Sequence, residues 1–66
     1  MSDVVLFTPQ RKARIEAGLS IRQLEVRTGI NRGMLSLYER GRYLPTLDEQ
    51  QRIVAALEAA TADRIA

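Results

Sequence analysis

Arginine side chains carry most of the positive charge of this 66-residue chain, since nine of its ten basic residues are arginine. The planar guanidinium group donates two parallel hydrogen bonds to a phosphate group or to guanine. Residues 11–42 hold eight basic and three acidic residues, a net charge of +5, whereas residues 43–66 hold two basic and four acidic residues. Such a basic segment is typical either of a solvated surface or of a surface that binds nucleic acid.

The chain contains no histidine and no cysteine. This absence removes the commonest general base, the usual zinc ligands and the nucleophile–histidine arrangements of many hydrolases. A catalytic site would have to use carboxylates alone, in a domain with little room for a pocket. We therefore expect a binding module with no catalytic residue, no bound metal or cofactor and no small-molecule ligand.

Length and hydropathy favour one cytoplasmic domain that occupies residues 1–66. No apolar run approaches the roughly 18 residues that a membrane span requires. The run Val4–Phe7 is too short for the core of a signal peptide, and it follows Asp3, where such a peptide is basic. The missing cysteines suit a reducing compartment, and we expect no membrane partner.

Capping residues predict three short helices before residue 42. Ser20 with Gln23 three residues later forms a capping box, and Gly29 suits the left-handed conformation that ends a helix. The other two predicted helices each begin at an N-cap residue and end at a glycine. These four residues are Thr8, Gly18, Asn31 and Gly41.

A second capping box, Thr46 with Glu49, predicts the start of a fourth helix. Apolar residues at helical spacing predict one buried face for a helix from Leu47 to about Ala60. The residues assigned to that face are Leu47, Ile53, Val54 and Leu57. Three alternatives remain open for residues 61–66: they extend this helix, bend into a fifth helix or fray. The predicted fold class is all-α, with four or five short helices.

The second and third predicted helices are about eight residues each, and the turn between them is Gly29-Ile30-Asn31. Two short helices joined by a tight turn that contains glycine are typical of a helix-turn-helix motif. Residues 20–41 are the corresponding window.

Further motifs lie between Arg11 and Leu57, and they are Leu19-Ser20, Leu24, Tyr38-Glu39-Arg40-Gly41 and Pro45-Thr46-Leu47. Together with the turn, they make the sequence similar to the helix-turn-helix domains of phage Cro and repressor proteins. This family is also called the xenobiotic-response-element type.

The resemblance implies a compact bundle of about five helices, like the DNA-binding domain of lambda repressor. It implies a transcriptional regulator that binds double-stranded operator DNA as a two-fold homodimer on near-palindromic sites. The third helix, Arg32–Arg40, would lie in the major groove. Arg14 matches the family's first-helix arginine and Glu39 matches the acidic residue with which it pairs, so we expect a structural pair.

Three residues depart from the family pattern. Ile21 stands where the family usually has glutamine, so only its backbone N–H can contact a phosphate. Glu25 replaces a small residue at the crossing of two helices and must lean outward or find a partner such as arginine. Gln50 replaces a leucine of the fourth helix.

Burial of Leu35 and Tyr38 would orient the third helix, because successive residues are separated by about 100°. The predicted base-contacting residues on its outer side are Arg32, Gly33, Ser36 and Leu37. The alternatives are a phosphate contact or an ion pair with Glu25 for Arg32, and a dimer interface or simple exposure for Leu37.

Contacts to phosphates are expected at the start of the second helix and just after the third helix. The residues predicted to make them are Ser20, Ile21, Arg40, Arg42 and Tyr43. An alternative function is a protein-binding module that keeps the fold, such as an anti-repressor or an antitoxin-like partner. It is motivated by apolar or small residues where DNA-binding relatives carry polar ones.

Overall fold

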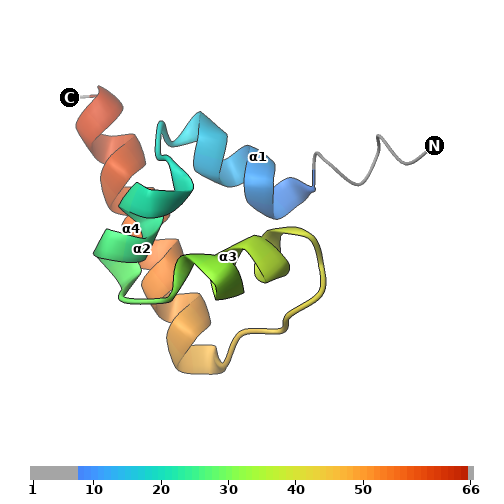
Figure 1. The fold of residues 1–66 in the computed structure, drawn as a ribbon. Helices are drawn as coiled ribbons and strands as arrows, with labels where there is room; N and C mark the ends of the chain where they lie inside the picture. The colour runs from blue at the N-terminus through green and yellow to red at the C-terminus, as the bar shows by residue number, and fades with distance from the viewer. Residues whose placement is uncertain (1–7, 66) are drawn as a thin grey trace.

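Four helices make up the regular structure of the part of the chain that the computed structural model describes, residues 8–65. They are α1 (Pro9–Glu16), α2 (Ile21–Thr28), α3 (Arg32–Glu39) and α4 (Leu47–Ile65). Figure 1 shows the three short helices and the longer α4, which passes behind α2. The predicted all-α fold is confirmed. The run Val4–Phe7 lies outside the described residues.

The helices begin where the capping residues predict. The Ser20 hydroxyl accepts the Gln23 N–H at 3.0 Å, and the Gln23 side chain accepts the Ser20 N–H at 2.8 Å. Gly29 ends α2 in the left-handed conformation, with φ of +74°. The Thr8 hydroxyl accepts the Arg11 N–H and caps α1, with proline at the first helical position. Free backbone N–H groups at the helix starts are therefore hydrogen-bonded by side chains next to them in the sequence.

The fourth helix is longer than the predicted segment and takes the first of the three courses considered for residues 61–66. The second capping box forms, with the Thr46 N–H donating to Glu49 at 2.9 Å and the Glu49 N–H donating to Thr46 at 3.1 Å. From there α4 continues to Ile65 without interruption. No glycine or proline occurs between Leu47 and Ile65, so nothing in the sequence bends the chain into a fifth helix.

The predicted buried face of α4 is partly wrong. Leu47 is 71% exposed and Val54 is 51% exposed, so neither belongs to the core. The buried residues of α4 are Ile53, Ala56 and Ala60. Two alanines on this face let α4 lie close to its neighbours, and their small side chains make the buried face look less hydrophobic than the exposed one.

The core lies where α2 meets its neighbours, because α2 packs against both α3 and α4. Its largest fully buried side chains are Leu24 of α2 and Leu35 of α3, with Ile30 between them in the chain. The helix α1 packs against α3 and α4. This packing buries one face of α3 and leaves the first turn of the opposite face exposed. No helix in the described part of the chain is long and apolar enough to cross a membrane.

Candidate nucleic-acid interface

The turn between α2 and α3 is held by buried contacts. The hydroxyl of the buried Thr28 donates to the Leu24 carbonyl at 2.8 Å and accepts the Ile30 N–H at 3.1 Å. Ile30 itself is buried in the core. On the other side of Thr28, its carbonyl accepts a hydrogen bond from Arg52 of α4 at 2.8 Å. The angle between α2 and α3 is therefore set by hydrogen bonds as well as by packing.

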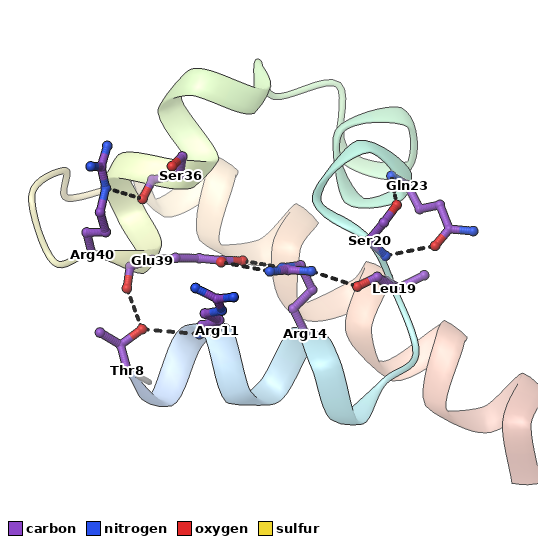
Figure 2. Close-up of polar contacts among 9 residues, drawn as sticks. All are labelled: Thr8, Arg11, Arg14, Leu19, Ser20, Gln23, Ser36, Glu39 and Arg40. Carbon is purple, nitrogen blue, oxygen red and sulfur yellow. Dashed lines mark hydrogen bonds and ion pairs between the residues drawn. The ribbon is translucent and has the colours of Figure 1, made fainter. Parts of the chain in front are cut away.

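Arg14 joins three parts of the molecule through one guanidinium group. It points from α1 to the Glu39 carboxylate on one side and to the Leu19 carbonyl on the other (Figure 2). The bonds are Nε to Oε2 at 2.6 Å, Nη2 to Oε1 at 3.2 Å and Nη1 to the Leu19 oxygen at 2.8 Å. The Thr8 hydroxyl donates to the Glu39 carbonyl. The C-terminal end of α3 is thus bound to both ends of α1.

The face of α3 away from the core contains the predicted base-contacting residues. Arg32 and Gly33 are exposed, whereas Ser36 and Leu37 are half-buried. The opposite side buries Leu35. The outer face is therefore most open in the first turn of α3.

The first turn of α3 is organised by two acceptors. Asn31 Oδ1 accepts the Gly33 N–H at 2.7 Å, and a Cβ at Gly33 would lie 2.9 Å from that oxygen. A glycine here leaves room for the cap. Glu25 of α2 accepts the Arg32 backbone N–H at 3.1 Å and forms an ion pair with Arg32 Nε at 3.2 Å. The ion pair between Arg32 and Glu25, one of the alternatives predicted for Arg32, is therefore present.

Two exposed arginines follow α3, on either side of Gly41. Arg40 Nε donates to the Ser36 carbonyl at 3.4 Å (Figure 2), and the Arg42 backbone N–H donates to the Leu37 carbonyl at 2.8 Å. Gly41 has φ of +77°, the left-handed conformation that turns the chain away from the helix. Both guanidinium groups are therefore carried on an ordered turn.

Tyr43, the third residue predicted for this region, already uses its hydroxyl proton. The hydroxyl donates to Glu49 Oε1 at 2.7 Å. This hydrogen bond raises the pKa of Tyr43 above its usual value and lowers the pKa of Glu49. A hydrogen bond from Tyr43 to a phosphate would first have to replace the bond to Glu49.

The family model described as helix-turn-helix matches residues 10–63, most of the chain. The chain belongs to the Cro/C1-type helix-turn-helix family. The resemblance found between Arg11 and Leu57 is thereby confirmed. Comparison with the curated proteins and with the solved structures gave no match. As a member of the family, this helix-turn-helix protein is a DNA-binding regulator.

The three departures from the Cro/C1-type pattern are accommodated in different ways. Ile21 is half-buried and packs against the core, so an anion contact at this position can use only its backbone N–H. Glu25 has its arginine partner in Arg32. The Gln50 amide donates to the Pro45 carbonyl at 3.2 Å.

Two residues that position the helix-turn-helix motif, Thr28 and Arg52, were not predicted from the sequence. No role for Thr28 was predicted, although its hydroxyl bridges the turn. Arg52 was counted only as a charge, although it bonds to the last carbonyl of α2. A threonine directly before the turn glycine is the one local signal, because threonine hydroxyls commonly bond to the carbonyl four residues earlier. The Arg52 contact crosses 24 positions and has no local signal.

Proposed function

We propose that this protein binds specific sites in double-stranded DNA as a small Cro-like or repressor-like transcriptional regulator, with α3 in the major groove. The observation that carries the proposal is the first turn of α3, where exposed Arg32 stands on a helix whose opposite face is buried. In helix-turn-helix proteins the N-terminal residues of the second helix reach the base edges. The net charge of residues 11–42 supports the same partner.

The proposed contacts divide into two groups by chemistry. Base contacts come from Arg32, Gly33, Ser36 and Leu37. Phosphate contacts come from Ser20, Ile21, Arg40, Arg42 and Tyr43. Arg32 donates to guanine O6 and N7, and the Leu37 side chain contacts a thymine methyl group. Phosphate contacts fix the register of the protein on the duplex and carry no sequence information.

The proposed binding unit is a homodimer on a near-palindromic site. One recognition helix covers only a half-site, and a two-fold dimer places two such helices one turn of DNA apart. An apolar strip of α4 supports self-association, because Leu47 and Val54 line one shallow groove together with Gln51. Both apolar side chains are more than half exposed.

A second candidate function is a protein-binding module with the same fold. It is favoured by exposed apolar side chains outside α4, of which Leu44 is 85% exposed and Val26 is 77% exposed. A partner that covers such side chains removes apolar surface from water, and this favours association. In this case duplex DNA would not be the physiological partner.

Selection of bound sites from random duplexes, followed by binding titrations at several salt concentrations, separates the two functions. For a DNA-binding regulator, log affinity falls linearly with log salt, with a slope of about −0.9 per phosphate contacted. We expect such a fall between about 50 and 200 mM salt, and tighter binding to selected than to random sites. Failure to enrich any site, or an affinity that does not change with salt concentration, would contradict the proposal and favour the protein-binding module.

A further inference from the structure

Glu25 holds Arg32 at two points. One carboxylate oxygen accepts the Arg32 backbone N–H at 3.1 Å, and the other pairs with Arg32 Nε at 3.2 Å. The two residues lie on different helices, and the turn Gly29-Ile30-Asn31 separates them. A carboxylate that binds both the main chain and the side chain of one residue restricts the rotamers of that side chain.

This geometry leaves the outer end of the guanidinium group available. Arginine has five N–H donors, and Glu25 approaches the guanidinium group most closely at Nε. The four N–H groups on Nη1 and Nη2 remain, and these can form the parallel pair of hydrogen bonds that guanine O6 and N7 accept. The Arg32 side chain is 58% exposed, so the held group still faces solvent.

The charge of Glu25 has a second consequence. Its side chain is 31% exposed and lies at the start of α3, so its negative charge offsets that of Arg32 at the same place. A phosphate group that approached Arg32 would also approach this carboxylate and be repelled. A guanine edge is uncharged and does not meet this repulsion.

From these contacts we propose that Glu25 is a specificity-determining positioning residue. It holds Arg32 ready for a guanine and makes the same arginine a poor partner for phosphates. The proposal rests on the proposed function, because it assumes that α3 reads the major groove. It assigns no contact with DNA to Glu25 itself.

The test compares Glu25→Ala and Glu25→Gln, alone and combined with Arg32→Ala. Each protein is titrated with the best selected duplex, with variants at each of its base pairs, and with unrelated DNA. Thermal unfolding of every variant confirms that it is folded. Glu16→Ala is the matched control, because it removes one exposed carboxylate from α1 instead of α2.

We expect Glu25→Ala to bind unrelated DNA more tightly and to lose discrimination at one base pair. The loss should be about two- to fivefold, the range that an exposed ion pair can supply. Glu25→Gln also removes the charge but keeps an oxygen acceptor, so it should gain affinity for unrelated DNA and retain part of the discrimination. In the Arg32→Ala background, Glu25→Ala should change no base preference. Glu16→Ala should leave discrimination unchanged.

Two results would overturn the proposal. The first is an equal change in affinity for all duplexes in Glu25→Ala, which would reduce Glu25 to a charge near DNA. The second is a change in base preference that persists without Arg32. If the wild-type protein selects no duplex at all, the proposed function itself fails, and this outcome differs from both.

Discussion

Arg14 and Glu39 form a two-bond ion pair that joins α1 to α3 across 25 positions of sequence. Their side chains are only 12% and 7% exposed. Each of the three donor nitrogens of Arg14 has a partner, because Nη1 bonds to the Leu19 carbonyl. The orientation of α3 therefore depends on this pair as well as on Leu35.

Removal of either partner should destabilise the fold strongly. Arg14→Ala and Glu39→Ala each leave a buried charge without its partner, and the expected loss is about 3–5 kcal/mol in the free energy of unfolding. The double variant should lose less than the sum of the two, as chemical denaturation of the four proteins will show. Asp48→Ala is the control, because it breaks an exposed ion pair with Arg52 and should cost about 0.3–0.5 kcal/mol. Additive losses would show that Arg14 and Glu39 do not stabilise each other.

Two glycines with nearly equal backbone angles should respond differently to alanine. Gly18 and Gly41 have φ of +78° and +77°, so alanine at either position should cost about 1–2 kcal/mol of left-handed strain. A Cβ at Gly18 would also lie 2.5 Å from Arg64 Nη1, whereas a Cβ at Gly41 would have no neighbour within 4 Å. Gly18→Ala should therefore be the more destabilising change in thermal unfolding, but only slightly, because the exposed Arg64 side chain can move away at the cost of its 3.3 Å bond to the Glu16 carbonyl.

The source of that difference can be checked with Arg64. In an Arg64→Ala background the contact with Gly18 is absent, and the two glycine substitutions should then cost the same. A difference that survives without Arg64 would mean that something other than this side chain crowds Gly18.

The bond between Tyr43 and Glu49 should appear in the acid stability profile. The Tyr43 hydroxyl and the Thr46 N–H lower the pKa of Glu49 below its ordinary value of 4.5. A carboxylate with a lower pKa in the folded state stabilises the fold above its unfolded pKa, and this contribution is lost as pH falls through the folded pKa. Tyr43→Phe should therefore reduce stability near pH 7 and make its fall below pH 4.5 shallower.

Denaturant titrations between about pH 3 and pH 7 measure this effect. Tyr38→Phe is the matched control, because Tyr38 packs against the core and has no bond to Glu49. An acid profile that is unchanged by Tyr43→Phe would show that this hydroxyl does not stabilise the ionised form of Glu49.

The sequence allowed the helix starts to be predicted because capping is local. Ser20 and Gln23 bond to each other's backbone, and so do Thr46 and Glu49, so these four residue types at a spacing of three suffice. The buried face of α4 was predicted less well. Leu47 and Val54 have the more hydrophobic side chains, but close packing against α1 and α2 selects the small Ala56 and Ala60 instead.

The candidate interface was predictable only in part, because some of its contacts depend on how the helices pack and not on local sequence. Periodicity around Leu35 indicated which side of α3 is free, because one turn of helix contains that information. The two contacts of Glu25 depend on the angle between α2 and α3, and that angle is set by Leu24, Thr28 and Ile30. Spacing along the chain could suggest a partner for Glu25 but could not show that Arg32 is held at both its backbone and its side chain.

We propose that α3 contacts the bases while the turn after it contacts the DNA backbone, and a comparison of Arg32→Ala with Arg42→Ala distinguishes these two roles. Both variants are titrated against the best selected site, its single-base variants and unrelated DNA, at several salt concentrations. Arg32→Ala should cost about 1–3 kcal/mol on the best site and relax the preference at one base pair. Arg42→Ala should weaken binding to all sequences about equally and reduce the salt slope by about one unit. The contrary result, a uniform loss for Arg32→Ala and an altered base preference for Arg42→Ala, would mean that the turn after Gly41 reads the DNA instead of α3.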